Sequence, residues 1–197
     1  MDLGIATRPK RGQSINGDAY FVGEYDGKVL LAVLDGVGHG EEANRAARRA
    51  IAFLENYRQP GLETLIQGCH RELRGTRGVV ISLALMNKGN STLSHAGIGN
   101  IESRIITEDN RMVHLISMNG VIGHNLRKVK EFQYPYHPGD TMVMFSDGIS
   151  SRFMTDLVRE GIPSPLNPLV DLPAVAQRIL EKHSKDDDAT VLLARLW

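Results

Sequence analysis

Short apolar runs separated by turn residues dominate this chain, and the pattern predicts more strands than helices. Residues 22–34 are typical of a hairpin with its turn at 25–28. A second hairpin is expected to join 79–86 to 92–96. The predicted strands are 3–7, 19–25, 28–35, 78–87, 90–98, 101–107, 112–116, 129–135, 141–147 and 189–196.

Three segments carry apolar residues at helical spacing: 41–57, 62–73 and 173–183. The first begins with two glutamates, which suit the positive end of a helix dipole. In the third, Asp171 is the expected N-cap and Pro173 lies in the first turn. The segment 162–168 holds three prolines and is predicted to be a surface loop.

The order of these elements predicts an α+β fold. Strands, two adjacent helices, a long run of strands, one helix and a last strand do not give the regular alternation of a doubly wound sheet. We expect two packed antiparallel β-sheets flanked by α-helices, an αββα sandwich. A chain of 197 residues suits one domain, and we assign residues 1–197 to it.

Composition narrows the function classes. Lys and Arg number 23, as do Asp and Glu, so no global field favours nucleic acid or an anionic membrane. Cys69 is the only cysteine, which excludes a disulfide framework and suits a reducing cytoplasm. Its helical spacing with apolar neighbours predicts a core position rather than a nucleophile. The chain lacks a signal-like start and a bilayer-length apolar run, so we expect a cytoplasmic protein.

Carboxylates follow or precede four predicted strands. The motifs are Asn16-Gly17-Asp18 before one strand, Asp35-Gly36 after the second strand of the first hairpin, Ser146-Asp147-Gly148 after another, and Asp187-Asp188-Ala189-Thr190 before the last. Each alone is also typical of a turn or a solvated loop. A carboxylate at the end of a buried strand is costly unless it is paired or binds a cation. Together the motifs indicate one site for hard divalent cations with oxygen ligands.

The ordered set resembles the metal-dependent serine/threonine protein phosphatases of type 2C, the PPM family. The likeness covers almost the whole chain: Asn-x-Asp, Asp-Gly-x-Gly, Gly-x-Gly-Asn, Ser-Asp-Gly and Asp-Asp-x-Thr follow one another. The family's fold is the sandwich already predicted, with a two-metal site at one edge. Glycine-rich residues 36–40 alternatively suit a phosphate cradle, but no nucleotide-binding motif accompanies them.

The resemblance implies roles for individual residues. Asp35 would bridge two Mn²⁺ or Mg²⁺ ions, and Gly36 would offer its carbonyl. Asp18 would complete one shell, while Asp147 and Asp187 would hold the second ion. Asp35 and Asp147 are therefore the candidate catalytic residues, since they would hold the metal-activated water that attacks phosphorus. In Asp188's place many relatives have asparagine, so Asp188 ranks second to Asp187.

Three positions depart from the family. Gln13 stands where many relatives have a phosphate-binding arginine, and Arg11 or Lys10 are the candidate substitutes. Val37 stands where eukaryotic relatives have a histidine that is a candidate general acid, and that role does not transfer to His39. Asn100 stands where relatives with a third metal have aspartate, so a third ion should bind weakly.

The small size resembles bacterial stressosome feedback phosphatases. The implied partner is a phosphorylated stressosome scaffold or antagonist protein with a STAS-type domain, dephosphorylated at serine or threonine. Residues 117–125 are either the remnant of a substrate-selecting flap or an ordinary connecting loop. Two alternatives stay open: a sporulation-type phosphatase of an anti-sigma-factor antagonist outside a stressosome, and a catalytically silent metal-binding interaction module.

Overall fold

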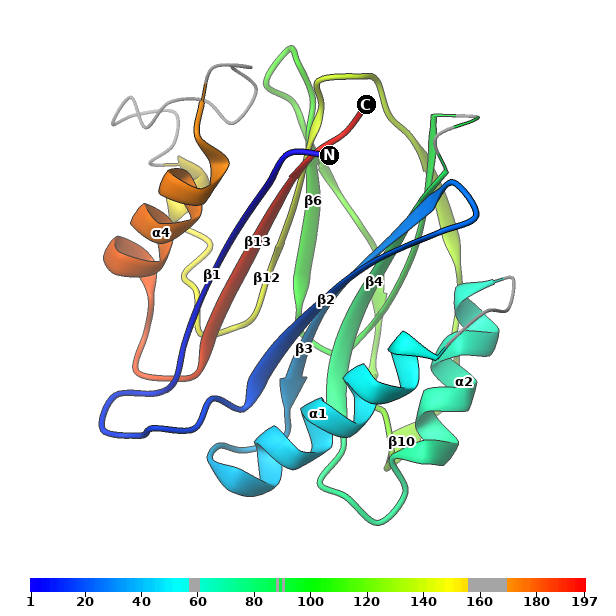
Figure 1. The fold of residues 1–197 in the computed structure, drawn as a ribbon, viewed down its shortest axis with the longest axis vertical. Helices are drawn as coiled ribbons and strands as arrows, with labels where there is room; N and C mark the ends of the chain where they lie inside the picture. The colour runs from blue at the N-terminus through cyan, green and yellow to red at the C-terminus, as the bar shows by residue number, and fades with distance from the viewer. Residues whose placement is uncertain (57–60, 88, 90, 156–169) are drawn as a thin grey trace.

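Two sheets packed face to face form the centre of the molecule, and helices cover both outer faces (Figure 1). The computed structural model describes residues 1–56, 61–87, 89, 91–155 and 170–197. This architecture confirms the predicted α+β sandwich. The two chain termini lie close together at one end of it (Figure 1).

The first sheet is antiparallel throughout, and the last strand lies near its middle. In spatial order its strands are β1 (Leu3–Arg8), β13 (Ala189–Arg195), β12 (Thr141–Phe145), β6 (Glu102–Ile106) and β7 (Met112–His114). The apolar runs of β12 and β13 are buried on both faces, as expected for central strands.

In the second sheet, the strands β2 to β5 are neighbours both in the sequence and in space. In spatial order its main strands are β11 (Phe132–Pro135), β5 (Thr92–Ile98), β4 (Val79–Asn87), β3 (Lys28–Gly36) and β2 (Asp18–Tyr25). The predicted hairpin turn is confirmed, because Asp26 and Gly27 both adopt positive φ (51° and 70°), as a tight two-residue turn requires. The hairpin register pairs Asp18 with Asp35 at the opposite end. Two predicted site residues thus become neighbours across the ladder.

The helices that cover the sheets in the described part of the chain include α1 (Glu41–Glu55), α2 (Leu62–Glu72) and α4 (Leu172–His183). Asp171 holds the N-cap position of α4 as predicted, but its side chain makes no capping hydrogen bond. Tyr57 and the predicted loop 162–168 lie outside the described residues. None of the helices in the described ranges is long and apolar enough to cross a membrane.

Apolar side chains fill three layers of core. One lies between α1, α2 and the second sheet, one between α4 and the first sheet, and one between the sheets. Cys69 is buried in the first of these, and burial raises the pKa of its thiol to about 12. A thiol that resists ionisation is a poor nucleophile, which confirms the core interpretation.

The segment 117–125 forms short strands rather than a free flap. It contains β8 (Ser117–Met118), which runs parallel to β5, and β9 (Gly120–Val121), which pairs with β10 (Asn125–Leu126). Backbone hydrogen bonds of 3.0 and 2.8 Å also join Val79 and Ile122 in both directions. The segment is therefore fastened to the second sheet.

Candidate metal centre

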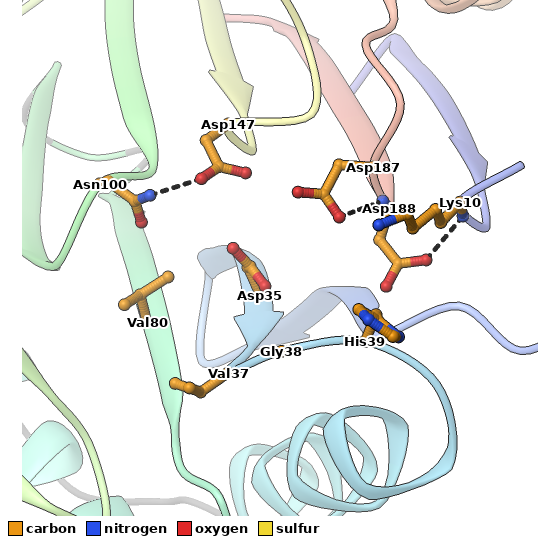
Figure 2. A pocket seen from close by; sticks show the side chains of 10 residues that line it. All are labelled: Lys10, Asp35, Val37, Gly38, His39, Val80, Asn100, Asp147, Asp187 and Asp188. Carbon is orange, nitrogen blue, oxygen red and sulfur yellow. Dashed lines mark hydrogen bonds between the residues drawn. The ribbon is translucent and has the colours of Figure 1, made fainter.

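An open pocket of about 300 Å³ gathers most of the predicted site residues (Figure 2). Its lining residues are Lys10, Asp35, Val37, Gly38, His39, Val80, Asn100, Asp147, Asp187 and Asp188. Asp35 comes from the end of β3, Asp147 follows β12, and the last two aspartates precede β13. Both sheets thus contribute carboxylates to one space.

Asp35 lies at the centre of this charge cluster. Its pKa is raised to about 8, first by burial and then by repulsion from Asp18, Asp147, Asp187 and Asp188. Without a cation, the site therefore favours a protonated Asp35 near neutral pH. A divalent cation would remove both the repulsion and that preference.

Asp18 lies beneath the pocket and is not one of its lining residues. It is 5% exposed, and its Oδ2 accepts a 2.6 Å hydrogen bond from the hydroxyl of Ser146. Burial raises the pKa of Asp18 to about 7, although hydrogen bonds from Ser146 and Thr190 lower it in part. Its Oδ1 is buried and has no hydrogen-bond partner.

Asp147 is the exposed carboxylate of the set, and two neighbours orient it. The Asn100 amide donates a 2.7 Å hydrogen bond to its Oδ2 (Figure 2). The Lys185 ammonium donates a 2.6 Å bond to the backbone carbonyl of Asp147. Asn100 therefore contacts a proposed ligand directly, and its role at a weakly bound third ion stays a prediction.

The adjacent aspartates before β13 point in different directions. Asp187 faces Asp147 and Asp35 across the pocket, whereas Asp188 turns toward Lys10 (Figure 2). The backbone N–H of Lys10 donates a 2.8 Å bond to Asp188 Oδ1, and Asp188 Oδ2 is buried without a partner. Asp187 thus faces the other carboxylates of the pocket, and its ranking above Asp188 stays a prediction.

The buried Asp140 provides an internal comparison. Its two oxygens accept backbone N–H bonds from Glu108 and His137, so this 1% exposed carboxylate is fully satisfied. Asp18 and Asp188 each leave one buried oxygen unpaired. Unpaired buried acceptors are costly, and a cation at the pocket would satisfy them. The all-oxygen donor set fits a hard divalent ion.

The carboxylates of the pocket stand apart from one another rather than in a tight ligand shell. Among the described residues, no three His, Cys, Asp or Glu side chains form a group that could hold a metal ion as placed. Repulsion among these carboxylates contributes to the raised pKa of Asp35, and a bound cation would offset it.

The glycines of both Asp-Gly motifs are required by close backbone approaches. A Cβ on Gly36 would lie 2.2 Å from the carbonyl oxygen of Ala43 in α1. A Cβ on Gly148 would lie 1.9 Å from the carbonyl oxygen of Asp188. Each glycine thus lets the aspartate before it sit against a neighbouring element.

We expect Gly148→Ala to destabilise the fold by about 1–3 kcal/mol, because Asp188 or the loop after β12 must shift. Gly89→Ala is the matched control, since its nearest contact would be an ordinary 3.4 Å. Urea denaturation of both variants tests this expectation. Equal midpoints for the two variants would show that the approach at Gly148 is not restrictive.

The two residues predicted to replace the relatives' phosphate-binding arginine differ in their position relative to the pocket. Lys10 lines the pocket, whereas Arg11 is exposed and is not one of the lining residues. Gln13 is occupied by His39, with 2.9 Å between Gln13 Nε2 and His39 Nδ1. Sequence reasoning gave no role to Lys185, which joins the loop before β13 to the backbone of Asp147.

Comparisons with known proteins agree with this geometry. A model of the family described as stage II sporulation protein E (SpoIIE) matches residues 25–197. The phosphoserine phosphatase RsbX of Bacillus subtilis (strain 168) is 25% identical over 152 residues, which are 77% of this chain and 76% of that protein. The stage II sporulation protein E of Priestia megaterium is 26% identical over 161 residues, 76% of this chain but only 27% of that longer protein.

Solved structures share the same fold. A chain from a structure of the bacterial stressosome, described as a modular system adapted to control secondary messenger signalling, is 34% identical with a TM-score of 0.88, and the match covers 98% of each chain. RsbX in complex with magnesium is 22% identical with a TM-score of 0.82, covering 98% of this chain and 94% of that one.

Proposed function

Since this chain is a phosphatase of the SpoIIE family, within the PPM (type 2C) class, we propose that it hydrolyses phosphoserine or phosphothreonine on a STAS-type protein of a bacterial stress-signalling pathway. One observation carries the proposal. Carboxylates from the ends of strands in both sheets surround a single pocket. Two buried carboxylate oxygens there, one of Asp18 and one of Asp188, have no hydrogen-bond partner.

The proposed ligands are Asp18, Asp35, the carbonyl of Gly36, Asp147 and Asp187, and they would hold two Mn²⁺ or Mg²⁺ ions. When bound, such ions supply a Lewis acid for the phosphoryl oxygens and make water a stronger nucleophile at neutral pH. The known link between the family and metals supports this assignment, as RsbX has been solved with magnesium.

The chain's own residues prepare the site. Ser146 and Thr190 hold Asp18 in place, and Asn100 fixes the orientation of Asp147. The hydrogen bond from the Lys10 backbone to Asp188 ties the residues after β1 to the loop before β13. Such preorganisation keeps the carboxylates in position for catalysis.

Water is the nucleophile in this proposal. The Ser146 hydroxyl is fully buried and already donates to Asp18, so it is not placed to attack phosphorus. Cys69 belongs to α2 and is buried in the core between the helices α1 and α2 and the second sheet. Hydrolysis then needs no phosphoenzyme, and the carboxylates of the pocket would hold the cations that supply the nucleophilic water.

Two kinds of phosphoprotein are candidate substrates, and they belong to different signalling pathways. Similarity to RsbX and to the stressosome chain supports a stressosome scaffold protein. The match to the SpoIIE family supports an anti-sigma-factor antagonist instead. This chain has all four motif aspartates, Asp18, Asp35, Asp147 and Asp187, which argues against a catalytically silent metal-binding module.

We expect a folded phosphorylated STAS domain to be a better substrate than a peptide copied from its phosphosite. Gln13 is neutral and bonded to His39, so contacts between the two protein surfaces outside the pocket would add to the alignment of the phosphoryl group. We expect kcat/KM to be at least about tenfold higher for the domain. Equal values for domain and peptide would contradict recognition of a folded partner.

A further inference from the structure

A free arginine lies beside the candidate metal centre. Arg77 belongs to the connection between α2 and β4, and its side chain is exposed. Its Nη1 lies 2.8 Å from the position of a Cβ added to Gly38, a residue that lines the pocket. Arg77 is far from Asp35 in the sequence, and the packing of the α2–β4 turn brings it to the loop after β3.

The backbone around Arg77 is held in place. The Thr76 hydroxyl donates a 2.7 Å bond to the carbonyl of Leu73, and the N–H of Gly78 donates a 3.0 Å bond to that hydroxyl. The N–H of Val37 donates a 3.1 Å bond to the carbonyl of Gly78. These bonds fix the turn that carries Arg77 relative to the loop that contains Val37 and Gly38.

The guanidinium of Arg77 is available for a ligand. It has no hydrogen-bond or ion-pair partner within the described part of the chain, whereas Arg45 and Arg49 on the nearby helix pair with glutamates. At the other candidate position, Gln13 is neutral and already bonded to His39. The unpaired guanidinium of Arg77 therefore lies beside the loop that contains Gly38, next to the pocket that the carboxylates line.

We propose that Arg77 binds the phosphoryl group of the substrate and is a specificity-determining residue of this site, an inference that rests on the proposed phosphatase function. A guanidinium can donate two parallel hydrogen bonds to a phosphate, which a lysine cannot match. Gly38 leaves room for it, because a side chain there would overlap Nη1 and its φ of 91° disfavours other residues. Arg77 thus supplies the positive charge that Gln13 lacks.

Arg77→Ala tests the proposal, with Arg74→Ala as the matched control. Neither arginine is itself a lining residue, but no atom of Arg74, which is exposed in the same connection, is among those nearest to Gly38. With manganese and p-nitrophenyl phosphate, we expect Arg77→Ala to lower kcat/KM by about tenfold or more, as for a lost hydrogen bond to a charged group. Arg77→Lys should recover part of the loss, and Arg74→Ala should match the wild type.

Binding of inorganic phosphate provides a readout that does not need turnover. Calorimetry on the manganese-loaded protein should show weaker phosphate binding for Arg77→Ala by a similar factor, with unchanged melting temperature. Identical behaviour of the two alanine variants would overturn the role of Arg77. A loss confined to a phosphorylated protein substrate would also overturn it, because Arg77 would then contact the partner rather than the phosphoryl group.

The two failures are distinguishable. A wild-type protein that binds manganese but hydrolyses no phosphoester would contradict the proposed function, and phosphate binding would still decide the role of Arg77. An active wild type with an unaffected Arg77→Ala variant would contradict only the present inference.

Discussion

Asp35→Asn is expected to lower manganese-dependent phosphatase activity by at least about 1,000-fold while the protein stays folded. Four other aspartates repel the charge of Asp35 and raise its pKa. Replacing this carboxylate with a neutral amide removes the charge that would be shared between two cations. At least one ion should then be lost from the site.

The same variant should be more stable than the wild type when metal is absent. The pKa of Asp35 is raised to about 8, so between about pH 4 and 8 the folded state keeps a proton that the unfolded state has lost. The wild type therefore loses stability as pH rises through this window. At pH 8 we expect Asp35→Asn to gain at least about 1 kcal/mol, or roughly 2–4 °C in melting temperature.

Asp26→Asn is the matched control for both measurements. It makes the same chemical change at the turn of the β2–β3 hairpin, at the opposite end from Asp35 (Figure 1). Activity and metal-free melting should stay at wild-type values. A folded Asp35→Asn protein with full manganese-dependent turnover would contradict the assignment of Asp35.

Manganese affinity should rise steeply with pH. The pKa of Asp18 is about 7 and that of Asp35 about 8 in the metal-free protein, both raised first by burial. Binding a cation must displace these protons below their pKa values. We expect the apparent Kd for Mn²⁺ to fall about 10- to 100-fold from pH 6 to 7, and to level off above about pH 8.

Calorimetry in two buffers with different ionisation enthalpies measures this coupling directly. It should show roughly one to two protons released per binding event at pH 6 and fewer at pH 8.5. Asp35→Asn should release fewer protons at pH 6 than Asp26→Asn. A pH-independent affinity without proton release would mean that the cation binds elsewhere.

Strand positions and the acidic motifs were predictable because they depend on local patterns. The apolar run before Asp35 predicts a buried strand, and the Asp-Gly pair predicts its sharp end. The structure then explains why glycine is needed: Gly36 and Gly148 each face a carbonyl oxygen of another element. That reason depends on packing between distant segments, which no local pattern contains.

Long-range pairings account for what the sequence could not predict. The contact of Asn100 with Asp147 joins the loop after β5 to the loop after β12. Arg77 reaches Gly38 only because the α2–β4 turn folds beside the end of β3. The separation of Asp187 from Asp188 likewise depends on side-chain directions set by Lys10 and the start of β13.

The most direct test of this account is phosphate release from a phosphoserine-bearing STAS domain before and after metal removal. We predict release with Mn²⁺ or Mg²⁺, loss of release with a chelator, and recovery when the ion is restored. Melting curves recorded in parallel would show that the protein stays folded throughout. Release that continues undiminished in the chelator, or a folded metal-bound protein that releases no phosphate from any phosphoester, would contradict the proposal of a metal-dependent phosphoprotein phosphatase.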